Sequence, residues 1–123
     1  DISGIGCVYQ LPSYSPIKAG SDEMDKWDPN WNKTSYASRD NYWAGAKKAC
    51  DDIGMSLPDK SKLESLAKKT TAEKEQLGLP TSGWFWSSSE GDAYGAYGVL
   101  FTNGLTAYDS KDYSGKRVLC VGD

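Results

Sequence analysis

The chain has 123 residues, a net charge of −3 and no histidine. This length suits one domain, spanning residues 1–123, with a hydrophobic core of its own. The acidic balance argues against nucleic-acid binding, which needs a basic face. The lack of histidine excludes Ser-His-Asp and Cys-His catalysis and histidine-ligated zinc. We therefore expect a protein that is not an enzyme and that holds no cofactor and no metal.

The three cysteines have no Cys-x-x-Cys spacing, which favours a disulfide over a metal site. Disulfides persist in exported proteins, so we expect an extracellular or cell-surface location. No apolar run approaches the roughly 20 residues of a membrane span. The sequence starts without Met and shows no signal peptide, so we expect a mature or trimmed fragment whose export signal or anchor is missing.

Residues 5–11 alternate in a way that predicts a strand containing Cys7. That thiol is expected to be free and buried, or bonded to another chain or to a missing segment. Residues 12–39 are rich in Ser, Pro, Asn and Asp and predict a long irregular loop pinned by Trp27 and Trp31. The acids of residues 22–28 are expected to be solvated, with cation binding as the alternative.

A first helix is predicted over about residues 41–53, with Asp40 as N-cap and Gly54 closing it. The helix carries an apolar stripe, which we expect to pack under a C-terminal sheet: Trp43, Ala46, Cys50 and Ile53.

Two further helices are predicted by their N-terminal caps. Asp59 caps the second, whose buried face is Leu63, Leu66 and Ala67. Thr70 and Glu73 form a capping box for a short third helix that ends at Gly78.

The remaining chain predicts strands over residues 84–89, 97–102, 105–108 and 117–121. Asn103 and Gly104 separate the second and third of these runs. An Asn-Gly pair in this position favours a tight type I′ hairpin with positive φ at both residues. The order of elements indicates an α+β fold, with two or three helices packed on a small twisted antiparallel sheet.

Four motifs in this order resemble those of C-type lectin-like domains, in particular the bacterial ones found on collagen-like adhesins and other exported proteins. They are Trp-Ala-Gly-Ala-Lys-Lys-Ala-Cys with Gly-Met-Ser-Leu-Pro, Lys-Leu-Glu-Ser-Leu, Trp-Phe-Trp-Ser-Ser-Ser-Glu and the terminal Arg-Val-Leu-Cys-Val. The resemblance covers about residues 40–121. It implies a disulfide between Cys50 and Cys120, a pairing that the expected topology also favours.

The sequence departs from the sugar-binding members of that fold. Their Glu-Pro-Asn or Gln-Pro-Asp triplet and the Trp-Asn-Asp that follows it are absent at the matching place. The Asp-Pro-Asn of residues 28–30 precedes the first helix instead. Calcium-dependent sugar binding is therefore not implied, and any ligand binding is expected to be independent of calcium.

Residues 87–98 and 108–115 are dominated by Tyr, Ser, Gly and Asp, the composition of antibody recognition loops. Lys111 and Arg117 would add positive charge. The alternative is that these are ordinary polar turns, with Tyr97 and Tyr108 merely cross-strand neighbours. The candidate ligand-binding residues are Glu90, Asp92, Tyr94, Tyr97, Tyr108, Asp109, Asp112, Tyr113 and Lys116.

These features predict an exported recognition or adhesion module that binds an extracellular glycan or a host or surface protein. The alternative is a structural subunit, a pilin or the head of a surface fibre, that assembles as a homo-oligomer through a missing N-terminal segment. In either case membrane attachment would come only from such a segment, and no nucleic acid is expected as a partner.

Overall fold

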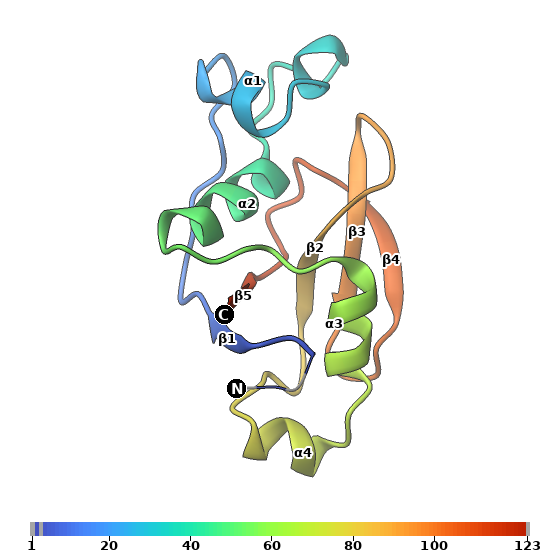
Figure 1. Cartoon of the computed structure of the whole chain (residues 1–123). Coiled ribbons are helices and arrows are strands. Elements are labelled where there is room, and N and C mark those ends of the chain that lie inside the picture. Colours follow the sequence, from blue (N-terminus) through green and yellow to red (C-terminus); the bar gives the residue numbers. More distant parts are fainter. Residues whose placement is uncertain (1, 3, 123) are drawn as a thin grey trace.

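A computed structural model describes residue 2 and residues 4–122 as an α+β structure (Figure 1). In this part of the chain the strands are β1 (Cys7–Gln10), β2 (Trp84–Glu90), β3 (Gly95–Leu100), β4 (Thr106–Ser110) and β5 (Leu119–Gly122). The helices are α1 (Glu23–Trp27), α2 (Tyr42–Asp52), α3 (Lys60–Ala67) and α4 (Thr71–Gln76), with a 3-10 turn η1 (Trp31–Lys33). The expected class is confirmed, while the C-type lectin-like topology stays a prediction.

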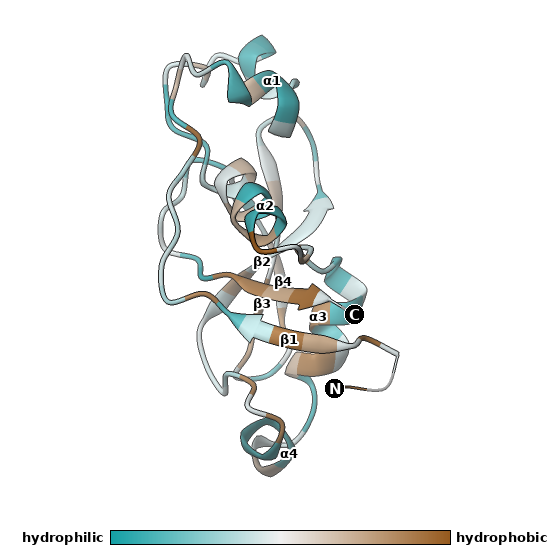
Figure 2. Cartoon of the chain, turned by 60° about the vertical axis from the view of Figure 1, so that its left-hand side comes forward, coloured by the Kyte–Doolittle hydropathy of each residue, from teal (hydrophilic) through white to brown (hydrophobic). Residues whose placement is uncertain are grey.

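The strands form two antiparallel sheets rather than one. β1 pairs with β5, and β2, β3 and β4 pair in that order. Figure 2 shows the apolar β5 running beside β1. The sheets are joined where the Trp86 amide donates to the Arg117 carbonyl at 3.0 Å and the Arg117 amide donates to the Trp84 carbonyl at 2.8 Å. Residues 117–122 therefore hydrogen-bond to both sheets, because Arg117 bonds to β2 and β5 pairs with β1.

The core between α3 and the three-stranded sheet is made by the predicted face of α3. Its leucines Leu63 and Leu66 are fully buried against Phe85, Val99 and Phe101. The two phenylalanine rings meet edge to face, with centroids 4.9 Å apart. This packing fixes α3 on one face of β2 and β3.

The second core surrounds the bond between Cys50 and Cys120, which confirms the predicted disulfide. Their Cα atoms lie 5.4 Å apart and are separated by 70 residues. Trp43 and Trp86 are buried in the same cluster. The disulfide thus ties α2 to the C-terminal strand β5, as expected. Ile53 does not join them: it follows the end of α2, is 47% exposed, and was wrongly predicted to be buried.

The start of α2 differs from the prediction by one residue. Its N-cap is Asn41, whose side-chain oxygen accepts from the Ala44 amide at 2.8 Å. The predicted cap, Asp40, accepts from the Ala19 amide instead, at 3.0 Å. The caps of α3 and α4 are as predicted: Asp59 accepts from an amide of α3, and Thr70 forms a full capping box.

The turn between β3 and β4 is also looser than predicted. Gly104 has a φ of +80°, but Asn103 has no positive φ, so the prediction of a type I′ turn is wrong. The Gly104 amide donates to the Leu100 carbonyl at 2.7 Å, and the Leu100 amide donates to Leu105 at 2.8 Å. The connection therefore spans residues 101–105. Asn103 stabilises it by accepting from the Leu105 amide through its side chain.

Residues 17–41 form a small unit, here named the upper lobe, which contains α1 and η1 (Figure 1). Ile17 and Asn41 close it by exchanging two backbone hydrogen bonds of 2.9 Å. Met24 and Trp31 are fully buried inside it. The expected irregular loop is therefore partly helical, and its pinning by Trp31 is as expected.

Candidate functional site

Two pairs of tyrosines lie near the junction of the three-stranded sheet and the upper lobe. We call Tyr36, Tyr94, Tyr97 and Tyr108 the tyrosine strip. Tyr97 and Tyr108 are direct cross-strand partners on β3 and β4, with ring centroids 6.1 Å apart. Tyr94, in the turn before β3, meets Tyr36 of the upper lobe edge to face at 5.0 Å. The two pairs are linked through Asp92, which accepts from the Tyr94 amide and from the Tyr108 hydroxyl.

Tyr108 is held in place by the packing of its ring on two glycines and by a hydrogen bond at its hydroxyl. Its ring fills the space that side chains would need at Gly91 and Gly95, where a Cβ atom would come within 2.7 Å and 2.2 Å of it. The hydroxyl donates to Asp92 at 2.7 Å. This bond raises the pKa of Tyr108 to about 12 and lowers that of Asp92. The ring is 48% exposed, so it offers a fixed contact surface to solvent.

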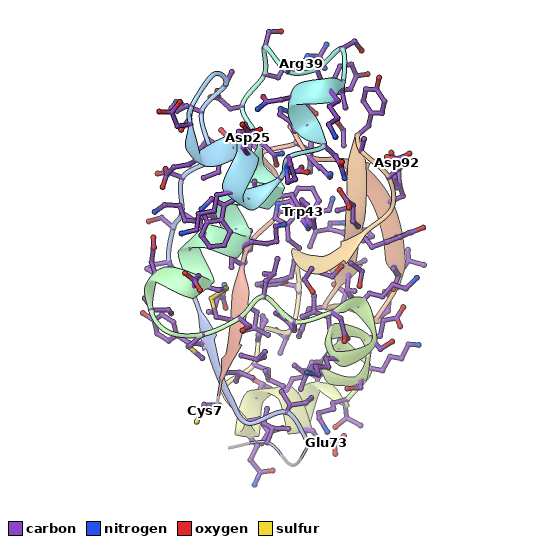
Figure 3. All side chains as sticks on the ribbon, turned by 45° about the horizontal axis from the view of Figure 1, so that its top comes forward. Cys7, Asp25, Arg39, Trp43, Glu73 and Asp92 are labelled. Atoms are coloured by element: carbon purple, nitrogen blue, oxygen red, sulfur yellow. A yellow bond between two sulfur atoms is a disulfide. The ribbon has the colours of Figure 1, made fainter. Side chains whose placement is uncertain are left out.

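A cation lies at each end of the tyrosine strip. The Arg39 guanidinium sits 4.1 Å from the centroid of Tyr36, and the Lys60 ammonium sits 4.3 Å from that of Tyr97. Such cation–π contacts orient both rings. Figure 3 shows Arg39 and Asp92 toward the same end of the molecule, with Cys7 at the opposite end.

The predicted acidic residues are mostly occupied by contacts within the protein. Asp92 accepts from the amides of Tyr94 and Gly95, both at 2.9 Å, as well as from Tyr108. Asp112 pairs with Arg39 at 2.9 Å. These carboxylates position loops and aromatic rings. Their contacts therefore do not support the prediction that they are free to accept hydrogen bonds from a ligand.

Lys116 was predicted to supply an exposed charge, but it is buried. Its ammonium pairs with Asp109 at 2.7 Å and lies 4.7–5.3 Å from the centroids of Trp84, Trp86 and Tyr113. The protein's own lysine therefore fills this aromatic cage. Tyr113 is exposed beside the cage and does not contact the tyrosine strip through any aromatic pair among the described residues.

Lys111 was likewise expected to be exposed and is instead fully buried. Its ammonium contacts Asp28 at 2.9 Å and Glu90 at 2.5 Å. Asp28 belongs to the loop expected to be solvated, yet it is buried too. Glu90, predicted to contact a ligand, thus takes part in an internal charged cluster.

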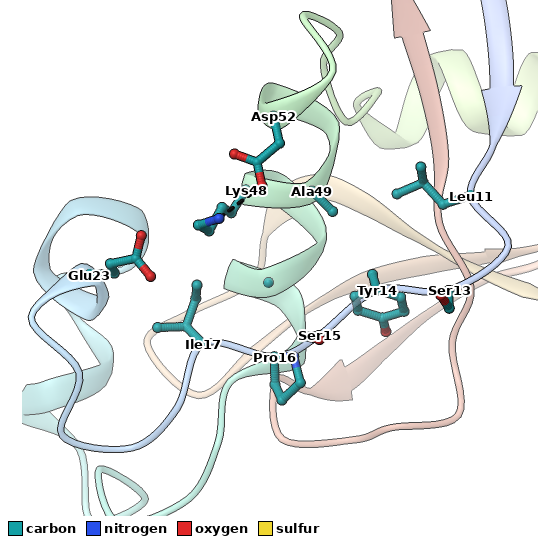
Figure 4. A pocket seen from close by; sticks show the side chains of 11 residues that line it. Leu11, Ser13, Tyr14, Ser15, Pro16, Ile17, Glu23, Lys48, Ala49 and Asp52 are labelled. Atoms are coloured by element: carbon teal, nitrogen blue, oxygen red, sulfur yellow. Dashed lines mark hydrogen bonds and ion pairs between the residues drawn. The ribbon is translucent and has the colours of Figure 1, made fainter.

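A hollow of about 400 Å³ lies elsewhere, between α2 and residues 11–17 (Figure 4). The side chains of Leu11, Tyr14 and Ile17 line one wall. Lys48 and Asp52, paired at 2.8 Å, stand on α2 at the other. Because Lys48 and Asp52 are already paired with each other, the tyrosine strip is the better candidate for binding.

The sequence did not point to three members of the site: Tyr36, Arg39 and Lys60. Tyr36 and Arg39 lie in the loop before α2 and Lys60 begins α3. They reach the strip only through tertiary packing. The Tyr-x-x-Arg spacing of residues 36–39 was the one available signal, because it suits a cation over an aromatic ring.

No described helix has the length and apolar character to span a membrane. Within residue 2 and residues 4–122, no group of three or more His, Cys, Asp or Glu side chains is placed to hold a metal ion.

The fold and site define the class of protein: a small α+β domain with a disulfide and with two pairs of tyrosines held by cation–π contacts and by a hydrogen bond to Asp92. The chain belongs to the family described as a domain of unknown function (DUF8780), whose model matches residues 31–122. No curated protein matches it. The family match includes the four tyrosines of the strip but not Asp28.

Proposed function

We propose that this chain is an exported recognition module that binds a glycan or protein ligand through the tyrosine strip, without calcium. The single observation that supports this proposal is the way in which the Tyr108 ring is held. One side of the ring packs on glycine backbone, the hydroxyl is bonded to Asp92, and the remaining surface is open to solvent. A rigid aromatic surface loses little conformational entropy on binding, so contacts made to it translate efficiently into affinity.

A glycan is a chemically suitable ligand for this surface. The C–H face of a pyranose ring is apolar and packs against an aromatic ring, while its hydroxyls need polar partners. Lys60 and Arg39 lie at the ends of the strip and carry donors. An exposed protein loop rich in apolar and acidic groups fits the same strip, and the disulfide supports an extracellular setting for either ligand.

The test is binding of the whole chain to a glycan array and to a panel of extracellular-matrix proteins, with calcium and with a chelator. We expect binding that the chelator does not change. Tyr108→Ala should weaken it at least about tenfold, since truncating a central aromatic contact costs about 2 kcal/mol or more. The matched control is Tyr9→Ala, which removes a 51% exposed tyrosine on β1, away from the strip.

Two results would contradict the proposal. One is the absence of binding above background to every glycan and protein at high density. The other is binding that Tyr9→Ala and Tyr108→Ala reduce equally, because the ligand would then lie outside the tyrosine strip.

The second candidate is a structural subunit of a pilus or surface fibre. The observation that favours it is the exposed face of β1, where Cys7 and Tyr9 are both open to solvent. β1 pairs with β5 on one side, and among the described residues no other strand covers its second side. Ordered self-association at micromolar concentration, measured by light scattering, would favour this role over ligand recognition.

A further inference from the structure

The buried cluster around Lys111 joins the upper lobe to the turn after β4. Lys111 and Asp28 are 83 positions apart, and both side chains are almost completely buried. The Lys111 nitrogen lies 2.9 Å from Oδ2 of Asp28. It also donates to the Ala93 carbonyl at 3.1 Å. An amine and a carboxyl group are thus held in contact in the interior.

Both reacting groups are fixed by their neighbours. The amide nitrogen of Asn41 donates to Oδ2 of Asp28 at 2.8 Å, and Asn41 is itself held as the N-cap of α2. The backbone of Lys111 donates to Tyr94 at 2.9 Å and accepts from Tyr42 at 2.7 Å. The pair therefore has little freedom to separate.

The surroundings supply an aromatic wall and a second carboxylate. The buried Trp43 ring has its centroid 4.5 Å from the lysine nitrogen, and its indole N–H donates to the Ser87 carbonyl at 2.8 Å. Glu90 lies 2.5 Å from the same nitrogen. Its side chain is 34% exposed, so it connects the buried pair to solvent.

We propose that Lys111 and Asp28 condense to an intramolecular amide bond, with Glu90 carrying the protons. The Lys111 nitrogen bonds to Cγ of Asp28, and the bond from Cγ to one carboxyl oxygen breaks. Glu90 accepts in turn the two protons that the ammonium must lose and passes both to the departing oxygen, which leaves as water. One water molecule leaves, and no oxidant, reductant or other reactant is needed.

General chemistry supports each step. The Lys111 nitrogen lies 2.9 Å from Oδ2 of Asp28, one bond away from the Cγ atom that it attacks. Holding the two groups in contact replaces a bimolecular encounter, an effect that reaches about 10⁵–10⁸ M in effective concentration for well-oriented groups. A positioned carboxyl group that transfers protons adds roughly 10²–10⁴-fold to the rate.

A second buried lysine provides the comparison. Lys116 contacts Asp109 at 2.7 Å, but that carboxylate is 39% exposed and no second carboxylate contacts the lysine among the described residues. Lys116 and Asp109 thus lack both the buried carboxyl group and the proton carrier, and we expect them to remain an ordinary ion pair.

The experiment is the intact mass of the reduced, purified whole chain, followed by peptide mapping. We expect a mass lower than that of the sequence by one water, and a branched peptide joining the segments that contain residues 28 and 111. Glu90→Gln should slow formation of this species at least about tenfold. Lys116→Met, which removes a buried lysine outside this cluster, should leave the loss of water unchanged.

A folded protein that keeps its full mass after prolonged incubation at 37 °C would overturn the proposal, because Lys111 and Asp28 would then form only an ion pair. So would a loss of water mapped to other residues. The mass of the unaltered chain decides the question even where Glu90→Gln fails to fold, and circular dichroism identifies that case.

Discussion

The bond between Tyr108 and Asp92 is the contact that most directly shapes the tyrosine strip. Asp92 holds the turn before β3 through two backbone amides and accepts the tyrosine hydroxyl at the same oxygen. One carboxylate thus links the conformation of the loop to the position of the ring. Removing its charge should change both.

We therefore predict that Asp92→Asn lowers the pKa of Tyr108 from about 12 toward its usual value near 10. The carboxylate disfavours the nearby phenolate, and an amide has no such charge. Ultraviolet titration of tyrosine ionisation should show one residue moving to lower pH. An unchanged curve would mean that the bond does not persist in solution. Tyr9→Phe identifies the contribution of an unrelated exposed tyrosine.

The same pair sets the sign of its contribution to pH-dependent stability. The folded pKa of Asp92 is lowered, so its stabilising contribution is present above the unfolded pKa and is lost as pH falls through the folded value. The folded pKa of Tyr108 is raised, so its contribution is present below its unfolded pKa and is lost as pH rises toward about 12. The strip is therefore best ordered between acidic and strongly alkaline pH.

Among the elements, α2 depends most on a single polar side chain. Asn41 caps the helix through its oxygen and holds the buried Asp28 through its nitrogen. Asn41→Ala removes the cap and a hydrogen bond to a buried carboxylate, so we predict a loss of about 2–4 kcal/mol in the free energy of unfolding.

The matched control is the neighbouring Asp40→Ala. Asp40 accepts one backbone hydrogen bond and pairs with an exposed lysine at 3.3 Å, so we expect a cost below about 1 kcal/mol. Urea unfolding of both variants measures the difference. Equal effects would mean that Asn41 is not the cap in solution.

The elements that the sequence predicted correctly depend on local chemistry. Asp59 and the Thr70–Glu73 box lie directly at the helix ends that they cap. Before α2, two residues that can cap a helix, Asp40 and Asn41, are adjacent in the sequence. Asn41 is the cap because its side chain also holds the buried Asp28. The prediction of a type I′ turn at Asn103 is wrong for a related reason. The Asn103 side chain accepts from the Leu105 amide, in a connection longer than a type I′ turn.

For the candidate site, the sequence predicted which loops are rich in tyrosine but not which charges are free. Tyr97 and Tyr108 were expected to be cross-strand neighbours only in the alternative of ordinary polar turns, and they are direct partners on β3 and β4. Lys111 and Lys116 were expected to offer positive charge to a ligand, but both are buried. Their burial depends on acidic and aromatic partners that are distant in sequence or brought together only by folding. Such partners leave no pattern in the sequence around the lysine.

At the scale of the whole molecule, two long-range links hold the chain together. The disulfide joins α2 to β5, and the Asp28–Lys111 contact joins the upper lobe to the turn after β4. The first closes residues 50–120 and the second closes residues 28–111, so the loops overlap. Whatever loosens the second link should release the upper lobe, which carries Tyr36 and Arg39 to the strip.

We predict that replacing Cys50 and Cys120 together by Ala lowers the free energy of unfolding by up to about 4 kcal/mol, the closure entropy of a loop of this length in an unfolded chain without another cross-link. Cys7→Ser is the control and should change it by less than about 0.5 kcal/mol, since the thiol is exposed and unbonded. Urea unfolding of the three proteins measures both effects.

The size of the disulfide effect also reports on the second link. An amide between Asp28 and Lys111 already restricts most of the same loop in the unfolded chain, so the disulfide would then add less than the full entropy. The loss on removing the disulfide should therefore be larger in the Glu90→Gln background than in the unaltered chain. Equal losses in the two backgrounds would indicate that the disulfide is the only covalent link between distant parts of the fold.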